Sequence, residues 1–227
     1  MDIQLHYVEK GCGEVLILLH GNGEDCSYFG HQIEYFSRYY RVIALDTRGH
    51  GASPRGEGAF TIRRFAEDLL QFMDAHQIAA AHLLGFSDGG NIALCFALAH
   101  PERVKGLILN GANLRAQGVK TSVQLPIEIG YRIARLFAKR DTKAQRKVEL
   151  LGLMVNDPNI DPAELSTLTM PVLVIAGTRD MIREDHTRLI AKEIANSQLV
   201  LLPGDHFIAN KEPIAFNHAV ENFLNGR

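Results

Sequence analysis

The sequence lacks several features that mark particular classes of protein. It contains no tryptophan, and its 3 cysteines among 227 residues form no C-x-x-C pair. So few, scattered cysteines are typical of a reducing compartment and argue against a disulfide framework or a zinc site. The formal net charge is only -2, so the composition does not indicate nucleic acid as a partner.

Targeting and membrane signals are also missing. The first residues show no basic stretch followed by an apolar one, so no secretory signal is predicted. Apolar runs such as Val15 to Leu19 are far too short to cross a bilayer. We therefore expect a cytoplasmic protein that has no membrane span and acts on a small molecule. The sequence leaves its oligomeric state open.

What the sequence does contain is a regular alternation of apolar runs and helix-like stretches. Val15 to Leu19 and Arg41 to Leu45 are nearly continuous apolar runs, typical of strands buried on both faces of a parallel sheet. The alternation predicts an α/β fold, with a doubly wound and mostly parallel sheet. Strands are predicted at residues 3–8, 15–19, 41–45, 81–86, 104–109, 171–176 and 198–202. Helices are predicted at residues 31–39, 62–76, 91–99, 186–194 and 213–224.

One segment interrupts this rhythm. Between residues 112 and 168 no strand is predicted, but two helical stretches are, near 123–138 and 142–156. An insertion at the carboxyl end of a strand in such a sheet lies over the ligand crevice. We expect residues 112–168 to form a short helical lid on a core made of residues 1–111 and 169–227. A helical pair that only decorates the surface is the alternative.

A Gly-flanked serine follows the predicted strand at residues 81–86. Gly85, Ser87 and Gly89 form a G-x-S-x-G pattern between an apolar strand and a helix of small residues. This is the sequence form of a nucleophile elbow, a tight strand-to-helix turn that exposes the serine hydroxyl. Bulky neighbours would clash in that turn, and the helix behind it directs N–H groups toward any oxyanion. Ser87 is therefore the candidate nucleophile.

Together with four other motifs, the elbow makes the chain resemble the α/β-hydrolase family over nearly its whole length. These motifs are His20-Gly21-Asn22-Gly23, the Asp46 to Ser53 segment, Gly177 to Asp180, and Gly204 to Phe207. The elbow and the segment Asn110 to Asn113 also look like those of the biphenyl-hydrolase-like branch. Its members include esterases that act on α-amino-acid esters. Family members often begin with a further antiparallel strand, which is missing here, so the resemblance implies about seven strands instead of eight.

Two further residues are predicted to act with the serine. A hydroxyl is a weak nucleophile, so Ser87 needs an adjacent base. His206, in a Gly-containing loop after the last predicted strand, is the candidate base, and Asp180 is the candidate acid that orients its imidazole. The order Ser, Asp, His along the chain is the one this family uses. Asp205 is an alternative acid, whereas the family's other position for the acid, after residues 104–109, carries no carboxylate.

The resemblance also assigns the oxyanion hole. Its two donors would be the backbone N–H groups of Asn22 and Asp88, while His20 is expected to have a structural role. Asp88 is unusual beside a nucleophile. Its carboxylate either binds a cationic group of the substrate, such as an α-ammonium, or lies at the start of the following helix as a cap.

The predicted insertion is basic and has an apolar face. Residues 112–165 hold nine Lys and Arg against six Asp and Glu. A solvated helix face is the favoured interpretation, and attraction for anionic substrates or for a membrane face is the alternative. Apolar residues at helical spacing predict packing of the insertion onto the core; they are Leu125, Ile129, Ile133, Leu136 and Phe137. Of these, Ile129, Ile133 and Phe137 are also candidate substrate contacts.

These observations predict an enzyme that cleaves a carboxylic ester, a thioester or an activated amide through an acyl-enzyme. Neither a metal nor an organic cofactor is expected. A C–C bond hydrolase or a cofactorless lyase would use the same three residues, and a non-catalytic ligand-binding relative would retain the fold. A haloalkane dehalogenase or an epoxide hydrolase is excluded, because these need Asp as nucleophile where this chain has Ser87.

Overall fold

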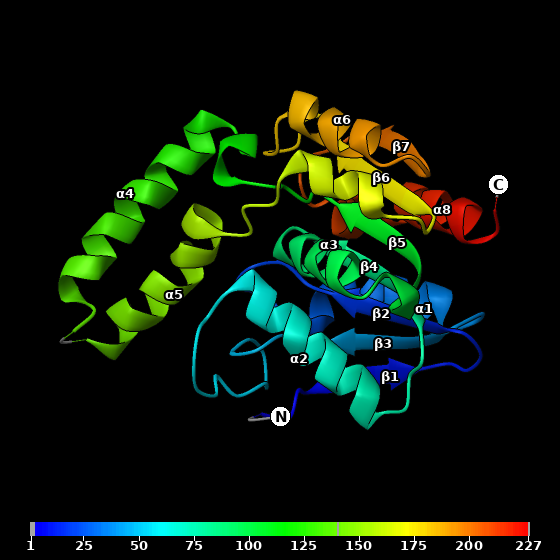
Figure 1. Cartoon of the computed structure of the whole chain (residues 1–227), viewed down its shortest axis with the longest axis horizontal. Coiled ribbons are helices and arrows are strands. Elements are labelled where there is room, and N and C mark those ends of the chain that lie inside the picture. Colours follow the sequence, from blue (N-terminus) through cyan, green and yellow to red (C-terminus); the bar gives the residue numbers. More distant parts are fainter. Residues whose placement is uncertain (1–2, 140, 227) are drawn as a thin grey trace.

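The computed structural model describes residues 3–139 and 141–226, and within them seven strands form one sheet in the order β1-β3-β2-β4-β5-β6-β7 (Figure 1). Only β1 runs antiparallel to its neighbour. The strands are β1 (Tyr7–Lys10), β2 (Val15–Leu19), β3 (Arg41–Leu45), β4 (Ala81–Phe86), β5 (Val104–Asn110), β6 (Val172–Gly177) and β7 (Ser197–Leu202). The predicted α/β fold with a mostly parallel sheet of about seven strands is confirmed.

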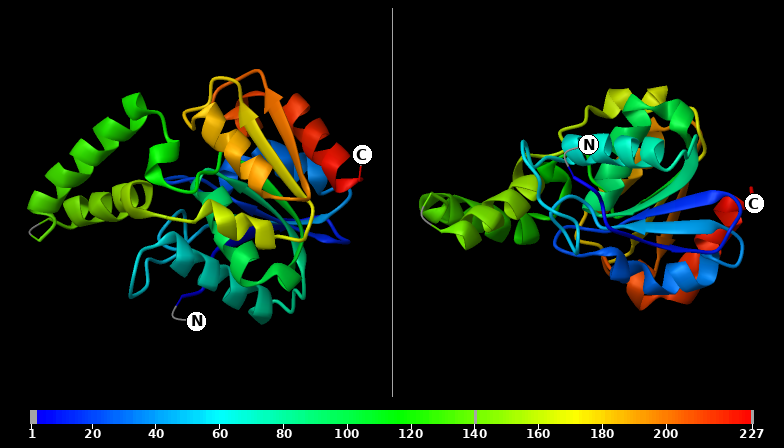
Figure 2. Two further views of the ribbon diagram at one scale, coloured as in Figure 1. Left: turned by 45° about the horizontal axis from the view of Figure 1, so that its top comes forward. Right: turned by 90° about the horizontal axis from the view of Figure 1, so that it is seen from below.

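Helices cover both faces of this sheet (Figure 2). The α-helices are α1 (Gly30–Phe36), α2 (Ile62–Ala75), α3 (Asp88–Ala99), α4 (Thr121–Phe137), α5 (Thr142–Asn156), α6 (Glu184–Glu193), α7 (Ile208–Lys211) and α8 (Pro213–Leu224). The 3-10 helices are η1 (Cys26–Phe29), η2 (Pro101–Arg103), η3 (Ala116–Gly118) and η4 (Pro162–Thr167). Apolar side chains of α2, α3 and α6 fill the core on one face, and those of α1, α7 and α8 fill it on the other.

Four residues lie outside the described part of the chain, namely 1, 2, 140 and 227. Arg140, one of the nine basic residues counted in the insertion, is among them. They also include the outer ends of the two ranges predicted for the core.

The first strand lies later in the sequence than predicted. Residues 3–8 alternate, but the ladder with β3 begins only at Tyr7 and continues to Lys10. Ile3 and Leu5 are buried in the core without joining that ladder. The alternation at the start of the segment therefore reflects burial of one face and not strand pairing. By contrast, β2 and β3 begin and end where predicted, because nearly all their side chains are buried.

Between β5 and β6 the chain forms a helical hairpin, α4 followed by α5, which extends away from the sheet (Figures 1 and 2). The base of the hairpin is closed by hydrogen bonds of Leu114. Its carbonyl accepts the backbone N–H of Ile160 at 2.9 Å, and its own N–H donates to Nε2 of His186 on α6 at 3.0 Å. Both helices lie close to their predicted positions. That residues 112–168 act as a lid stays a prediction.

The prediction that the apolar face of α4 packs onto the core is wrong. All five of its large side chains are exposed: Leu125, Ile129, Ile133, Leu136 and Phe137. The opposite face of α4 meets α5 instead, and there Gln124 and Ala134 are buried. Helical spacing identifies one face of a helix, but it does not determine what covers that face.

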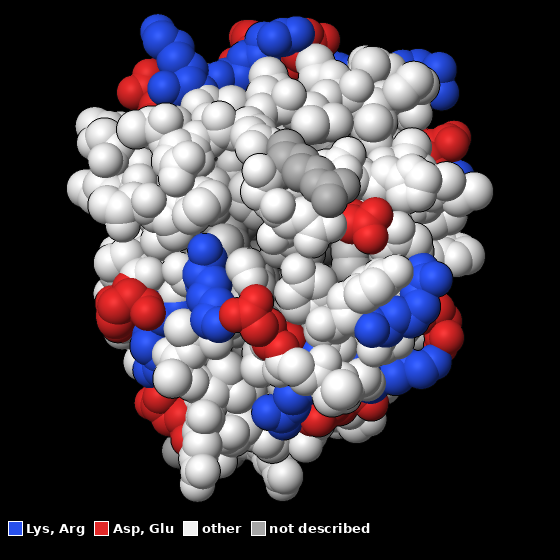
Figure 3. Space-filling view, turned by 90° about the vertical axis from the view of Figure 1, so that its right-hand side faces the viewer, with Lys and Arg blue, Asp and Glu red and all other residues white. Residues whose placement is uncertain are grey.

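Charged groups are distributed unevenly over the fold. Arg48, in the loop after β3, forms a fully buried pair with Asp68 of α2, with Nε–Oδ2 and Nη2–Oδ1 distances of 2.7 and 2.6 Å. The face turned away from the hairpin carries acidic and basic side chains intermingled (Figure 3).

Among the described residues, no helix combines the length and the hydropathy that crossing a bilayer requires.

Candidate active site

Ser87 occupies a sharp turn between β4 and α3. Its backbone has φ 54° and ψ -119°, a conformation that L-residues rarely adopt and that costs on the order of 1–3 kcal/mol. Two glycines make the turn possible. A Cβ on Gly85 would lie 2.2 Å from the carbonyl oxygen of Gly89, and a Cβ on Gly89 would lie 1.9 Å from the carbonyl oxygen of Leu19. The start of α3 therefore packs directly on backbone, as the predicted elbow requires.

His206 and Asp180 come together although 26 residues separate them. Asp180 follows β6 and His206 follows β7, so adjacent parallel strands deliver both to the same edge of the sheet. Nδ1 of His206 lies 2.6 Å from Oδ1 of Asp180, and that oxygen also accepts the backbone N–H of Ile182 at 2.8 Å. Both side chains are buried. The carboxylate therefore fixes the imidazole with Nδ1 as donor and Nε2 as acceptor.

The alternative acid, Asp205, is engaged elsewhere. Its Oδ1 accepts the backbone N–H of Phe207 at 2.9 Å, and its Oδ2 pairs with Nζ of Lys211 at 2.5 Å, on the exposed surface. Asp180, by contrast, is held by Lys120, whose Nζ donates a hydrogen bond to the Asp180 backbone carbonyl at 2.5 Å. The sequence did not predict this contact, which joins the residue before α4 to Asp180, the residue that bonds to His206.

The imidazole of His206 lies beside the elbow. Its ring centroid is 4.8 Å from that of Phe86, the residue immediately before Ser87. A Cβ on Gly111, which follows β5, would lie 2.7 Å from the imidazole, so no side chain fits there. Nε2 of His206 is buried, and no hydrogen bond reaches it from the described residues. This nitrogen is thus the free basic atom at the edge of the sheet.

The two predicted oxyanion donors both border the elbow. Asp88 is the first residue of α3, where backbone N–H groups have no acceptor within the helix. Asn22 lies in the loop after β2. That loop contacts the elbow, because a Cβ on Gly21 would lie 3.0 Å from the Phe86 ring. The Asn22 side-chain amide donates to the carbonyl of Leu150 in α5 at 2.8 Å.

Asp88 carries an almost unpartnered buried carboxylate. Its Oδ1 has only a long contact with Nδ2 of Asn91, at 3.5 Å, and its Oδ2 is buried with no hydrogen bond from the described residues. Burial raises the pKa of Asp88 to about 6, and the amide of Asn22 partly offsets this effect. Asn91 is in turn held by Asn113, through contacts of 3.1 and 2.9 Å. The sequence gave no indication of this amide pair.

A second carboxylate, also missed, lies near the imidazole. Glu24 is half-buried, and its Oε2 accepts the backbone N–H of Gly21 at 3.3 Å. Burial raises its pKa, while the hydrogen bond from Gly21 and the charge of His206 lower it. An acidic residue two positions after the predicted oxyanion donor was visible in the sequence, but nothing there indicated its burial.

His20 has the structural role that was predicted for it. Its Nδ1 lies 2.7 Å from the Gly21 carbonyl, and its Nε2 accepts the backbone N–H of Thr47 at 3.0 Å. The pKa of His20 is lowered by burial. This neutral imidazole therefore joins the loop after β2 to the loop after β3 and leaves no nitrogen for chemistry.

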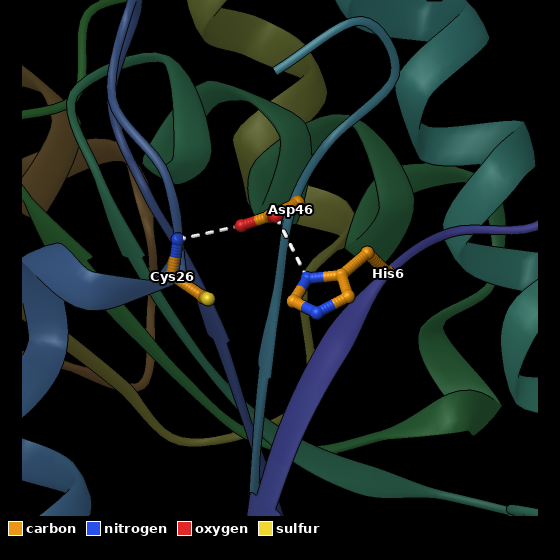
Figure 4. Close-up of side chains that lie close together, drawn as sticks. All are labelled: His6, Cys26 and Asp46. Carbon is orange, nitrogen blue, oxygen red and sulfur yellow. Dashed lines mark hydrogen bonds and ion pairs between the residues drawn. The ribbon is translucent and has the colours of Figure 1, made fainter. Parts of the chain in front are cut away.

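One group of side chains has the composition of a metal site. His6, Cys26 and Asp46 offer ligand atoms within 4.8 Å of one another (Figure 4). Hydrogen bonds account for this arrangement. Asp46 accepts Nδ1 of His6 and the backbone N–H groups of Cys26 and Ala52, at 2.7 to 2.8 Å. Burial raises the pKa of the Cys26 thiol to about 12, so the thiol is protonated in this hydrogen-bonded arrangement. The group braces the loop after β3.

The fold and this arrangement of side chains define a class of protein. Residues 14–140 match the family model described as alpha/beta hydrolase fold, and the chain belongs to that family. Among its relatives, 3-oxoadipate enol-lactonase 2 of Acinetobacter baylyi is 30% identical over 97% of this chain and 92% of its own length. The human protein named serine hydrolase BPHL is 28% identical over 98% of this chain and 83% of its own. The prediction of the biphenyl-hydrolase-like branch is consistent with this relative.

Solved structures agree with the fold. The enol-lactonase of Burkholderia xenovorans superposes with a TM-score of 0.78 at 26% identity, covering 98% of this chain and 97% of the other. The relatives named here are enol-lactonases and a serine hydrolase, so the family indicates hydrolysis but does not identify one substrate.

Proposed function

We propose that the protein is a serine hydrolase that cleaves a carboxylic ester, thioester or activated amide through an acyl-enzyme. The 2.6 Å contact between His206 and Asp180 carries this proposal. It leaves Nε2 of the imidazole without a partner among the described residues, beside the residue that precedes Ser87. A base oriented in this way is what a serine hydroxyl needs in order to attack a carbonyl carbon.

In the proposed reaction, His206 takes the proton of the Ser87 hydroxyl as its oxygen attacks the carbonyl. The backbone N–H groups of Asn22 and Asp88 hold the resulting oxyanion, an effect worth roughly 3–4 kcal/mol for one donor. The leaving group departs with the proton from His206, and water repeats the cycle on the acyl-enzyme. Asp180 keeps the imidazole in the correct tautomer throughout.

We propose further that Asp88 binds a cationic group of the substrate. Its Oδ2 is buried and lacks a partner among the described residues, which favours a ligand that brings both charge and hydrogen-bond donors. An α-ammonium fits this description. The test compares kcat/KM for an α-amino ester and its des-amino analogue in the wild type and in Asp88→Asn. A loss confined to the amino ester supports the assignment, and equal losses on both esters contradict it.

Labelling with a fluorophosphonate probe tests the nucleophile directly. The wild type is expected to acquire one label, on Ser87, and Ser87→Ala to acquire none. Ser166→Ala is the matched control, because this exposed serine bonds only to the Ala163 carbonyl within η4. His206→Ala is expected to label at least a hundredfold more slowly, since general-base activation is lost. A folded wild type that does not react with the probe would contradict the proposal and favour a ligand-binding protein.

A substrate panel separates hydrolysis of esters from the same-triad alternatives. C–C bond hydrolases and cofactorless lyases would also label at Ser87. They would, however, cleave C–C bonds in substrates such as diketones, and their rates on simple acyl esters would be very low. Turnover of esters at rates well above those for C–C substrates is the expected outcome.

A further inference from the structure

The exposed face of α4 is an apolar surface without a cover in the described structure. Five large side chains, all about half exposed or more, lie on it: Leu125 (53%), Ile129 (49%), Ile133 (53%), Leu136 (78%) and Phe137 (56%). At 100° per residue, these positions form one stripe along the helix. Exposed apolar patches of this kind mark interaction surfaces far more often than scattered single residues do.

This stripe is separate from the contact between α4 and α5. The α5-facing side of α4 includes Gly130, where a Cβ would lie 3.4 Å from Leu151, and Tyr131, whose hydroxyl accepts a hydrogen bond from Asn156 at 3.1 Å. Because α5 occupies that side, the stripe faces away from it. The hairpin itself projects from the body of the molecule (Figures 1 and 2).

Basic side chains line one edge of the stripe. Arg132 and Arg135 of α4, and Lys139 just after it, are exposed and lie to one side of the apolar residues by helical geometry. Glu128, the acidic residue of α4, lies on the same edge by helical geometry and is partly exposed, so the edge has three cations against one acid. This local excess of positive charge contrasts with the mixed charges on the opposite face of the molecule (Figure 3).

We propose that α4 docks on an anionic lipid surface, with its apolar stripe in the acyl-chain boundary and the basic side chains at the headgroups. An amphipathic helix with aliphatic and Phe residues on one face and Arg and Lys beside them lies in such an interface. Long basic side chains reach the headgroups while their carbon stems remain in apolar surroundings.

Charge favours this occupant over a second copy of the chain. In an antiparallel pair of stripes packed face to face about a twofold axis, the same helix edge of each copy would come together. Three cations of each copy, Arg132, Arg135 and Lys139, would then lie beside an edge of the other copy that has the same three cations and one acid, Glu128. On an anionic lipid surface the same three cations are attracted, each strengthening binding roughly fivefold.

The hairpin that carries the stripe contacts the candidate active site at two points outside the stripe. Lys120, directly before α4, bonds to the carbonyl of Asp180, and Leu150 of α5 bonds to Asn22. Binding itself does not depend on the proposed reaction.

The absence of tryptophan makes a direct test possible. Leu136→Trp places a single indole on the stripe, and Ile214→Trp places one at an exposed position on α8 as the control. With vesicles of phosphatidylcholine and phosphatidylglycerol, the emission of Leu136→Trp is expected to shift to the blue and to be quenched by brominated lipid. The emission of Ile214→Trp is expected to remain unchanged.

Sedimentation with the same vesicles measures the affinity without a probe. Arg132→Gln with Arg135→Gln is expected to lower vesicle binding about twentyfold, and Ile133→Ser with Leu136→Ser to lower it at least tenfold. Ile214→Ser should match the wild type. Because all these side chains are exposed, circular dichroism and thermal unfolding should be unchanged in every variant.

Three outcomes would overturn the proposal. The first is a wild type that does not bind anionic vesicles. The second is equal binding to neutral and anionic vesicles that the stripe variants do not alter. The third is self-association without vesicles that Ile133→Ser with Leu136→Ser abolishes, since this would assign the stripe to a second copy.

Discussion

The side-chain amide of Asn22 donates a hydrogen bond to the backbone carbonyl of Leu150, across 128 residues of sequence and at a distance of 2.8 Å. One partner lies in the loop that holds a proposed oxyanion donor, and the other lies in the middle of α5. The position of the hairpin and the position of that loop are therefore linked by a direct polar contact. Its removal leaves the Asn22 backbone N–H in place.

Asn22→Ala is expected to lower kcat/KM about two- to tenfold, because one hydrogen bond contributes about 0.5–1.5 kcal/mol. Amide exchange near Leu150 in α5 should become faster at the same time, since the helix loses one of its contacts with the core, while the pair of Glu149 with Arg55 remains. Asn156→Ala is the matched control, because it removes an amide that bonds to Tyr131 within the hairpin and not to the core. Unaltered kinetics and exchange in Asn22→Ala would show that this contact has no role.

Asp88 should make stability depend on pH. Burial raises its pKa from the ordinary 3.8 to about 6, so the folded chain retains a proton that the unfolded chain has lost. The stabilisation from this group is complete below pH 3.8 and disappears as the pH rises through about 6. Over that range Asp88→Asn, which does not titrate, should gain stability relative to the wild type, on the order of 2 kcal/mol.

Urea unfolding of both proteins between pH 4 and pH 8 measures this difference. The two curves of unfolding free energy against pH should diverge between about pH 4 and pH 7. Curves that stay parallel would mean that the Asp88 carboxylate is hydrated or paired in the folded protein.

The buried pair of Arg48 and Asp68 should be essential for stability. Both side chains are at most 1% exposed, and Asp68→Asn removes the charge that pairs with the guanidinium there. The expected loss in the free energy of unfolding is about 3–5 kcal/mol. Glu184→Gln, which removes one partner of the exposed pair with Arg188, should cost less than about 1 kcal/mol. Equal effects of the two substitutions in urea unfolding would contradict the distinction.

Gly89→Ala should abolish the elbow. The added methyl group would lie 1.9 Å from the carbonyl oxygen of Leu19, and backbone cannot give way as a flexible side chain can. We expect either loss of folded protein or at least a hundredfold loss of activity at Ser87. Gly30→Ala is the control, because nothing lies within 4 Å of a Cβ there and the residue already has helical φ and ψ. A Gly89→Ala variant as active as the control would refute the close contact.

The sheet was predictable because its central strands are buried on both faces. Nearly continuous apolar runs such as Val15–Leu19 and Arg41–Leu45, which alternate with helical stretches, predict strands buried on both faces of a parallel sheet. Asp180 and His206 were predictable for a related reason. Each follows a strand, and the carboxyl ends of parallel strands meet at one edge of the sheet. That geometry brings them to 2.6 Å without any local sequence signal between them.

Other features depend on contacts that periodicity does not encode. The stripe on α4 has the same spacing as a buried face. It is exposed because α5 packs against the other side of α4. Ile3 and Leu5 have the alternation of a strand but pack without a ladder. Asp88 was noticed for its charge, yet its burial depends on neighbours such as Asn91 that arrive with the fold. That Ile129, Ile133 and Phe137 contact substrate stays a prediction.

The closed base of the hairpin has a consequence for how such proteins diversify. Ile160 bonds to Leu114, so the chain leaves and re-enters the body through two neighbouring residues. The segment between them, residues 115–159, begins and ends at neighbouring positions. It can therefore be exchanged for the equivalent segment of a relative without a change in the connections of the sheet. Recombination at this junction would replace the whole hairpin, while the residues proposed to perform the chemistry, which lie outside it, are inherited unchanged.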